Sequence, residues 1–314
     1  MKAAIIRAFG GPENFEIADM PVPQPGAGQV LVRVHAASVN PVDYKIRQNG
    51  AWAHVPMPAI LGYDAAGTVA AIGEQVQHLK VGDEVCYSAH IFGRQGTYAE
   101  YHVEDAEIVV KKPACLNFEA AAALPLAAMT AYDAIISFFK TKPGDTVLVH
   151  AGAGGVGSMA VQLAKASGAR VIATGHQDNA DLIRSLGADE VIDYRSVAFE
   201  EAVNRLTGGC GVDAAFDTVG GNTISRSTVC VRPFGKLATV VSVEGSLAGM
   251  KLRNQTLYFG FLERTKAKIE AVSILASRAQ IRPLIDRVYP LDAIADAHRK
   301  LEAGGSRGKI VITI

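Results

Sequence analysis

The stretch that decides the fold is Thr146–Gly175, which reads TVLVHAGAGGVGSMAVQLAKASGARVIATG. It predicts an apolar strand, a loop at residues 152–157 that fits the spacing GxGxxG, and a helix that ends at Gly168. The first glycine of such a loop allows a tight turn, the second lets the backbone approach a pyrophosphate, and the third lets helix and strand pack closely. The helix N-terminus then offers N–H groups and a positive dipole to phosphates. A purely structural turn is the alternative. The predicted contacts of a dinucleotide with this loop are Gly152, Ala153, Gly154, Gly155, Val156 and Gly157.

Apolar strands alternate with short helices on both sides of this loop. Further helices are predicted near residues 181–186, 199–206 and 223–231, and an Ala-rich helix at residues 118–139 has a break at Pro125. Strands that alternate with helices in this way indicate a parallel sheet covered on both faces. The sequence therefore predicts an α/β domain with a doubly wound parallel sheet of the Rossmann type.

The two ends of the chain have a different pattern. The first third holds short β-type runs between Pro- and Gly-rich turns, which indicate a compact, barrel-like domain. The last 50 residues predict helices at 264–278 and 291–302 and then a β-run, GKIVITI, that needs a sheet to join. We expect this run to return to the first domain, which makes that domain discontinuous. The predicted domains are 1–122 with 263–314, and 123–262.

Composition excludes several classes of protein. The 314 residues include 31 Lys+Arg and 31 Asp+Glu, with 49% hydrophobic residues, which excludes a disordered chain or a coiled coil. A net charge of zero gives no reason to expect nucleic acid or an anionic membrane as partner, and mildly favours self-association. The apolar segment Ala120–Phe139 contains Pro125 and Asp133, so we expect a buried helix and not a membrane span.

The cysteines argue against both structural zinc and disulfides. They are four in number and the nearest two are 20 residues apart, so neither a zinc ribbon nor a secreted disulfide scaffold is expected. The apolar run before Arg7 is too short for a signal peptide. We expect a cytoplasmic protein.

The end of the second strand bears on the choice of dinucleotide. NAD sites place an acidic residue about 20 residues after the loop, whereas this strand ends in Thr174, Gly175 and His176. Asp178 and Asp181 follow, but they are typical of the start of the next helix. We therefore expect NADPH. The groups available to its 2′-phosphate are His176, Arg184 and Tyr194, with a loop residue, a solvated helix residue and a strand residue as the respective alternatives.

The whole chain resembles the medium-chain dehydrogenase/reductase superfamily, and within it the zinc-independent quinone oxidoreductase (zeta-crystallin-like) branch. The resemblance implies a GroES-like domain for the discontinuous β-rich part and a Rossmann domain for the rest. The segments that carry it include SVNPVDYKIR, LGYDAAGTVAAIGEQV, VGDEV, GTYAEY, LPLAAMTAYDAI, the glycine loop, LGADEVIDYR, FDTVGG and the terminal GKIVI.

The same resemblance shows where zinc ligands are replaced. Alcohol dehydrogenases of the superfamily bind catalytic zinc through a Cys and a His at the positions that Asn40 and Tyr63 occupy here. Amide and phenol oxygens are poor zinc ligands beside thiolate and imidazole, so we expect no metal. Without a Lewis acid, alcohol oxidation is disfavoured, whereas hydride transfer to a quinone or to the β-carbon of an enone needs only donors for the developing negative charge.

The resemblance also implies a set of site residues. It places Asn40, Asp43 and Tyr44 beside the nicotinamide, with Asn40 bonding cofactor or substrate and Tyr44 donating to the oxyanion. An Asn-Pro turn and a packed tyrosine are the alternatives. Trp52, where enoyl-thioester reductases carry a catalytic Tyr, and Tyr63 are the remaining pocket candidates. The further cofactor candidates are Thr130, Val219, Ser242, Val243 and Lys309, the last with a solvated charge as its alternative.

We therefore expect NADPH-dependent reduction of a quinone, a small-molecule acceptor. Reduction of α,β-unsaturated aldehydes or ketones is one alternative, and a non-catalytic NADPH-binding protein is another. Asn179 stands where many NADPH-using relatives have Lys, so NADH remains a second cofactor to test. An edge strand near Leu257–Leu262 predicts a homodimer.

Overall fold

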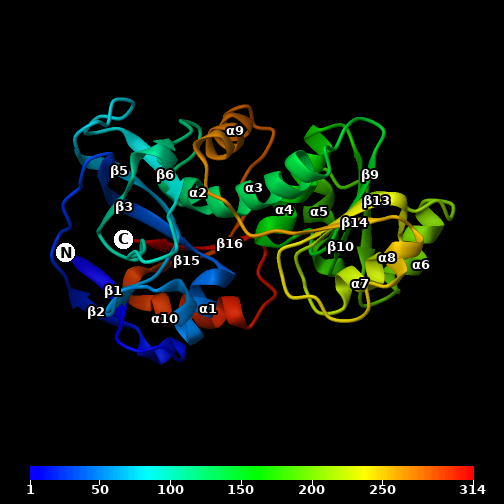
Figure 1. Ribbon diagram of the computed structural model, residues 1–314, viewed down its shortest axis with the longest axis horizontal. Helices are drawn as coiled ribbons and strands as arrows, with labels where there is room; N and C mark the ends of the chain where they lie inside the picture. Colours follow the sequence, from blue (N-terminus) through cyan, green and yellow to red (C-terminus); the bar gives the residue numbers. More distant parts are fainter. The chain divides into compact units, whose positions relative to one another are not determined.

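The computed structural model describes residues 1–314 and divides into two compact units (Figure 1). The first comprises Met1–Leu126 with Glu263–Ile314, and the second is Ala127–Leu262. The boundary predicted at residue 122 differs by four residues. Helix α2 (Phe118–Ala123) packs against strands of the first unit, and the backbone N–H of Leu126 donates to the Asp64 carboxylate at 2.9 Å, which holds this stretch to the first unit.

The first unit is built on two sheets. The smaller has the antiparallel order β2-β1-β4, and the larger has the order β15-β16-β3-β5-β6-β8, with β7 paired to β3. Strand β16, at the end of the chain, pairs parallel with β15 and antiparallel with β3. Their bounds are β1 Lys2–Ile6, β2 Glu16–Asp19, β3 Gln29–Val39, β4 Ala59–Ile60, β5 Asp64–Ile72, β6 Glu84–Ser88, β7 Tyr101–Asp105, β8 Val110–Lys111, β15 Ile285–Pro290 and β16 Lys309–Thr313.

Helices of the first unit follow from local signals. Helix α1 begins after Asn40, whose backbone N–H donates to Asp43 at 2.8 Å while Pro41 fills the first helical position. The predicted terminal helices are present, with α10 preceded by a 3₁₀ turn at Leu291–Ala293. The bounds are α1 Pro41–Asn49, α2 Phe118–Ala123, α9 Lys266–Ser277 and α10 Ile294–Glu302.

The second unit confirms the Rossmann class. Its six strands are all parallel in the order β11-β10-β9-β12-β13-β14, so chain direction across the sheet reverses between β9 and β12. The strands are β9 Thr146–Val149, β10 Arg170–Gly175, β11 Glu190–Asp193, β12 Val212–Asp217, β13 Val231–Thr239 and β14 Thr256–Phe259. The helices are α3 Pro125–Tyr132, α4 Gly155–Ala166, α5 Ala180–Ser185, α6 Phe199–Leu206, α7 Thr223–Ser227 and α8 Gly249–Leu252.

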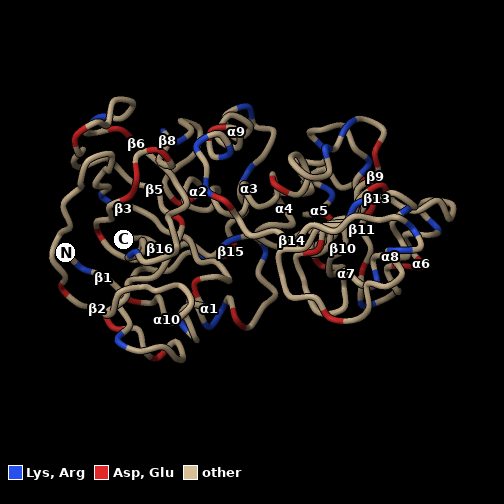
Figure 2. Tube along the Cα trace, in the orientation of Figure 1, with Lys and Arg blue, Asp and Glu red and all other residues tan.

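One prediction in this unit was too long. The helix expected at 223–231 ends at Ser227, because Val231 already belongs to β13, where it pairs with Val212 of β12. Acidic and basic residues are interspersed along the chain of both units (Figure 2).

The apolar helical run from Phe118 to Phe138 is the one segment long and apolar enough to cross a membrane by length and composition. It is 72% buried inside the protein and changes from α2 to α3 at Pro125 and then to a π-helix at Asp133–Phe138. Its residues pack against β3 and β5 in the first unit and against α4 in the second, as core helices do.

Candidate active site

The glycine loop after β9 has no room for a side chain at Gly157 and little room at Gly152. A Cβ on Gly157 would lie 2.1 Å from the carbonyl oxygen of Ala151, and a Cβ on Gly152 would lie 3.0 Å from the Cβ of Ala173. Gly154 precedes α4 in an extended conformation, and Ala151 takes the left-handed conformation that the tight turn needs. The loop backbone therefore packs closely against its neighbours, as the glycine spacing in the sequence predicts.

This loop fits a dinucleotide. Helix α4 has 12 residues, and the first N–H groups of a helix have no acceptor within it. They lie at the carboxyl end of β9, beside the point where strand order reverses, which is where open α/β sheets bind ligands. Because four of the six loop residues are glycines, backbone N–H groups of this loop can meet phosphate oxygens directly.

Other predicted cofactor residues follow the carboxyl ends of neighbouring strands. Exposed Val219 follows β12, and its backbone N–H is held by Asp217 at 2.8 Å. Ser242 and Val243 follow β13, and Val243 bridges to Gly221. Thr130 is buried on α3, within the second unit.

The end of β10 supports the turn more than it presents groups to solvent. Buried Thr174 accepts the backbone N–H of Ala151 at 3.2 Å, so its hydroxyl supports the glycine loop from beneath. A Cβ on Gly175 would lie 2.3 Å from the Cδ1 of Ile183, so close packing against Ile183 accounts for a glycine at this position. The His176 imidazole accepts the N–H of Asp178 and lies 3.3 Å from its carboxylate.

A basic residue that the sequence analysis did not select lies at the same edge. Gly175 pairs with Asp193, which places Tyr194 and Arg195 after the strand next to His176. The Arg195 guanidinium lies 5.9 Å from the ring of exposed Tyr194, whereas Arg184 is engaged by Asp181 at 2.9 Å. The signal in the sequence was a basic residue directly after the tyrosine that follows a strand.

In the first unit, Asn40 belongs to a buried polar network. Its amide N–H donates to the Asp64 carboxylate at 2.9 Å, and its amide oxygen accepts a hydrogen bond from the ammonium group of Lys309. Lys309 also donates to the Val39 carbonyl at 3.1 Å and lies 3.4 Å from Asp64, which accepts the Ser38 hydroxyl at 2.9 Å. Lys309 is therefore a buried ion-pair partner, and the alternative of a solvated charge is wrong. Sequence analysis missed Asp64, which directly follows Tyr63.

Asp43 and Tyr63 are also inside this unit. The Asp43 carboxylate is fully buried and accepts the Tyr98 hydroxyl at 2.6 Å, and burial raises its pKa to about 7. Tyr63 is fully buried as well, so desolvation raises the pKa of its phenol, and its hydroxyl has no hydrogen-bond partner in the protein. Both were pocket candidates, but neither side chain reaches the surface in this structure.

Two candidates of the first unit remain accessible. Tyr44 is half-buried on α1, where burial and the nearby Glu302 carboxylate raise the pKa of its phenol. Trp52 is 43% exposed in the turn after α1. These two side chains can therefore meet a ligand without rearrangement of the core.

The residues at the superfamily's zinc positions do not fit a metal. A metal at Asn40 would compete with the Lys309 ammonium for the same amide oxygen, and two cations would repel each other there. Tyr63 would have to ionise where burial strongly favours its neutral form. No step of the chemistry is therefore assigned to a metal at this position.

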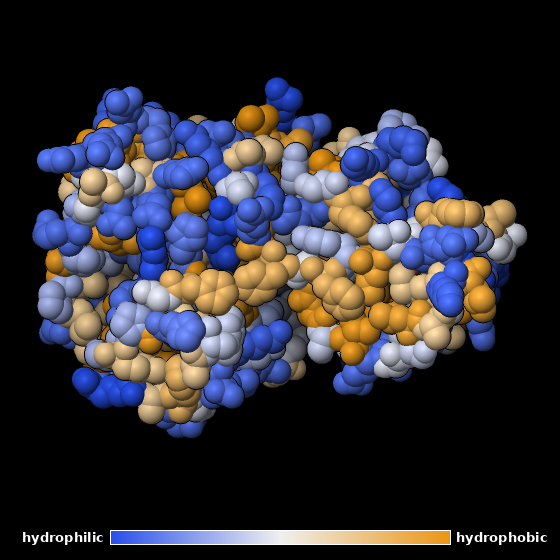
Figure 3. Space-filling view, viewed as in Figure 1, coloured by the Kyte–Doolittle hydropathy of each residue, from blue (hydrophilic) through white to orange (hydrophobic).

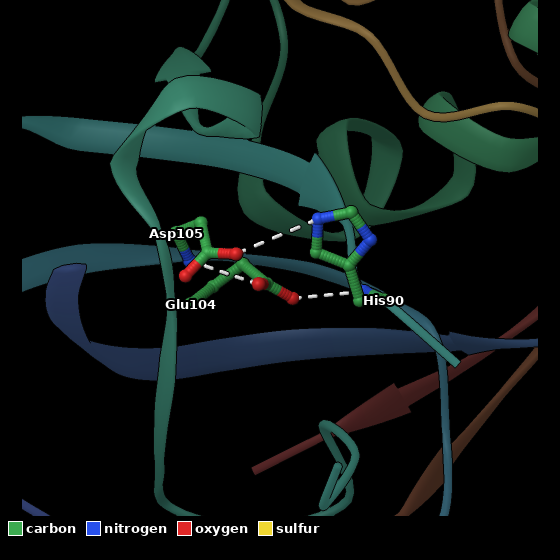
Figure 4. A group of neighbouring side chains, drawn as sticks. All are labelled: His90, Glu104 and Asp105. Atoms are coloured by element: carbon green, nitrogen blue, oxygen red, sulfur yellow. Dashed lines mark hydrogen bonds and ion pairs between the residues drawn. The ribbon is translucent and has the colours of Figure 1, made fainter. Parts of the chain in front are cut away.

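A second group has the composition of a metal site. His90, Glu104 and Asp105 place their ligand atoms within 4.8 Å of one another (Figure 4). The Arg94 guanidinium, however, donates to Glu104 at 3.2 Å and to Asp105 at 2.8 Å. The positive charge that these carboxylates need is already supplied, so the group serves to fix the loop that carries His90 and Arg94.

A Rossmann sheet with a glycine loop where the strand order reverses, in a chain that also forms a discontinuous β-rich unit, defines a nicotinamide-dependent oxidoreductase. Comparison with known proteins supports this class. The family model for the alcohol dehydrogenase GroES-like domain matches residues 26–114, and the model named zinc-binding dehydrogenase matches residues 186–312. The chain belongs to the medium-chain dehydrogenase/reductase superfamily, in its zeta-crystallin-like quinone oxidoreductase branch.

Relatives agree over the full chain. Human quinone oxidoreductase is 32% identical, with 100% of this chain and 98% of that protein covered, and Pseudomonas aeruginosa quinone oxidoreductase is 35% identical, with 97% of each covered. The structure of the Coxiella burnetii quinone oxidoreductase matches with a TM-score of 0.89 and 32% identity, and the match covers 100% of this chain and 99% of that chain. A mycobacterial protein solved in complex with NADPH matches with a TM-score of 0.90 and 33% identity over 100% of both chains.

Proposed function

We propose that this oxidoreductase transfers hydride from NADPH to a quinone without a metal. The observation that carries the proposal is the Lys309–Asn40–Asp64 network at the positions where metal-dependent relatives would hold zinc. Alcohol oxidation needs a group that acidifies a hydroxyl, and this network offers none. The relatives named quinone oxidoreductases support the same acceptor class.

The chain binds, orients and protonates, while the bound cofactor supplies the hydride. Quinone, hydride and one proton together give the hydroquinone, so a proton must reach the oxygen on which negative charge develops. Tyr44 is the accessible phenol that donates to this oxygen, and solvent returns its proton. The glycine loop and the first turn of α4 hold the pyrophosphate.

Steady-state assays with NADPH on a matched panel of quinones and enones test this function. We expect acceptor-dependent oxidation of NADPH with quinones. Turnover of enones without turnover of quinones would establish the unsaturated carbonyl reductase instead. Tight NADPH binding without any acceptor-dependent oxidation would establish a non-catalytic binding protein.

We further propose a preference for NADPH over NADH, carried by Tyr194 and Arg195 beside a strand end without an acid. Replacing Arg195 by Ala removes a charge-assisted contact, so kcat/KM for NADPH should fall roughly tenfold relative to NADH. Exposed Arg205, on α6, provides the matched control as Arg205→Ala. An unchanged NADPH/NADH ratio in Arg195→Ala would contradict this assignment.

We also propose a cytoplasmic homodimer that pairs through β14. This strand is at the end of the sheet order, so one edge of its backbone has no partner strand, and Phe259 and Phe261 are exposed beside it. Apolar residues gather on the face of the second unit seen in Figure 3. All four cysteines are free, as the reducing cytoplasm favours. A monomeric mass in light scattering at working concentration would contradict the dimer.

A further inference from the structure

A buried histidine lies directly before the glycine loop. His150 follows β9 and is 2% exposed, and its ring packs edge to face against Phe199, with ring centroids 4.7 Å apart and ring planes at 73°. Burial lowers the pKa of its imidazole to about 3, so the ring is neutral at physiological pH. A neutral imidazole has one donor and one acceptor nitrogen, and its two hydrogen bonds therefore have a fixed direction.

The partners of the ring decide which nitrogen carries the proton. Nε2 lies 2.9 Å from the hydroxyl of Ser227 on α7, and Nδ1 lies 3.2 Å from the hydroxyl of Thr174 at the end of β10. The Ser227 hydroxyl donates to the carbonyl of Thr223 at 2.8 Å, so its oxygen accepts the Nε2–H. Nδ1 then accepts the proton of Thr174. The opposite tautomer would leave that proton without an acceptor in a buried position, which is costly.

This directed set of hydrogen bonds continues into the glycine loop. Because Thr174 donates to His150, its oxygen has a lone pair that accepts the backbone N–H of Ala151 at 3.2 Å. Ala151 has a left-handed φ of 55°, which a residue with a side chain adopts only at a cost. Its carbonyl accepts the N–H of Gly154 at 2.8 Å. The peptide groups on both sides of Ala151 are thus held, and they set the course of the loop.

The backbone of His150 is held at the same place. Its N–H donates to the carbonyl of Phe216 in β12 at 2.9 Å, and its carbonyl accepts the hydroxyl of Thr218 at 3.0 Å. The residue therefore joins β9, β10, β12 and α7 where the strand order reverses. The Nδ1 side of the ring leads to the loop through Thr174, whereas the Nε2 side leads to α7.

We propose that His150 is a positioning residue for the dinucleotide, whose Nδ1 lone pair orients the Thr174 hydroxyl so that this hydroxyl holds the glycine loop in its binding conformation. The inference rests on the cofactor half of the proposed function and does not depend on the acceptor. The N–H groups of Gly152 and Gly154 each bond within the protein at 2.8 Å, so the loop is ordered without a ligand. A loop that is ordered in advance binds phosphate oxygens at little entropic cost.

Amide side chains separate the roles of the two ring nitrogens. In His150→Asn the amide oxygen can take the place of Nδ1 and accept from Thr174, whereas in His150→Gln the amide nitrogen can take the place of Nε2 and donate to Ser227. Isothermal titration with NADPH should give a Kd within about twofold of the unmodified protein for His150→Asn and a Kd raised about fivefold to tenfold for His150→Gln. Both variants bury an amide in place of the ring, so both unfolding temperatures should fall to a similar extent.

The partners of the ring give a second test that needs no change at His150. Thr174→Val removes the hydroxyl at nearly constant volume and should raise the Kd for NADPH about fivefold to tenfold, and Thr174→Ser should restore it. Ser227→Ala is the matched control on the other side of the ring. It should lower the unfolding temperature while the Kd stays within about twofold.

Several results would overturn the positioning role. They are equal increases of the Kd in His150→Asn and His150→Gln, an unchanged Kd in Thr174→Val, and a Kd that follows the unfolding temperature through all the variants, Ser227→Ala included. An unmodified protein that binds neither NADPH nor NADH would overturn the cofactor assignment together with this role. Absence of quinone turnover would overturn the acceptor alone, because the titrations contain no acceptor.

Discussion

Asp43 is a fully buried carboxyl group whose pKa is raised to about 7 by desolvation, against a value near 3.8 when exposed. The folded protein therefore binds this proton more tightly than the unfolded chain does, and the free energy of unfolding should fall as pH rises from about 4 to about 7. Asp43→Asn removes the titration and should flatten this slope. The change in the free energy of unfolding that disappears between about pH 4 and pH 7 is at most about 4 kcal/mol. Urea unfolding at several pH values measures it.

The control for that experiment is Asp292→Asn, at an exposed aspartate of the same unit. Its stability profile should run parallel to that of the unmodified protein. If the profile of Asp43→Asn is also parallel, burial of a neutral Asp43 is not the source of the pH dependence.

Gly157 offers a second test at the level of a single atom. In Gly157→Ala the new Cβ meets the backbone carbonyl of Ala151, so either α4 or the loop must shift. We expect a loss of about 1–3 kcal/mol in the free energy of unfolding and a large loss of NADPH affinity. Gly249→Ala is the matched control, because its nearest neighbour would be 4.0 Å away. Unfolding and isothermal titration of both variants decide whether close approach is the reason for the glycine.

The two units differ in how far single residues could be predicted. The spacing of the glycine loop specifies backbone geometry locally, so the role of Gly157 was readable from six residues. Lys309 was not readable in this way, because its partner Asp64 is 245 residues away in the chain. Asn40 and Asp43 likewise take their burial from strands that only the complete fold brings around them.

At the scale of elements, Asp64 at the start of β5 and Lys309 at the start of β16 form a buried ion pair. Asp64→Asn or Lys309→Met alone leaves an uncompensated buried charge and should cost about 3–5 kcal/mol of stability. The double variant should recover most of that loss while hydride transfer stays low, because Asn40 has lost its orientation. Unfolding and turnover of all three variants measure the two effects separately.

The exposed pair Lys165–Asp189, at 2.7 Å, is the comparison. Breaking it should cost under about 1 kcal/mol, since water and salt screen exposed charges. A double variant at Asp64 and Lys309 with full turnover would show that the network serves stability only.

Elements were predicted well where periodicity is long and less well where tertiary pairing intervenes. Helix α6 has the predicted bounds Phe199–Leu206, since its amphipathic pattern is local. Helix α7 ends four residues earlier than expected, because pairing with β12 draws Val231 into a strand. Sheet order in the first unit, with β16 between β15 and β3, involves partners that no local pattern encodes.

For the whole molecule, removal of metal should have no effect. The candidate positions hold their own cations, Lys309 at Asn40 and Arg94 at Glu104 and Asp105. Dialysis against EDTA should therefore leave both quinone turnover and the unfolding temperature unchanged, and added zinc should not raise activity. Activity that is lost to the chelator and restored by zinc would contradict the assignment of the network.

The position of β16 at the end of the chain has a consequence for synthesis on the ribosome. Residues 127–262 form a continuous segment, so the second unit can complete its sheet as soon as it has emerged. The larger sheet of the first unit has a gap between β3 and β15 until residues 309–313 are translated. Its buried acid Asp64 gains its counter-ion only then. The nascent chain can thus complete the sheet of its second unit before the larger sheet of its first unit.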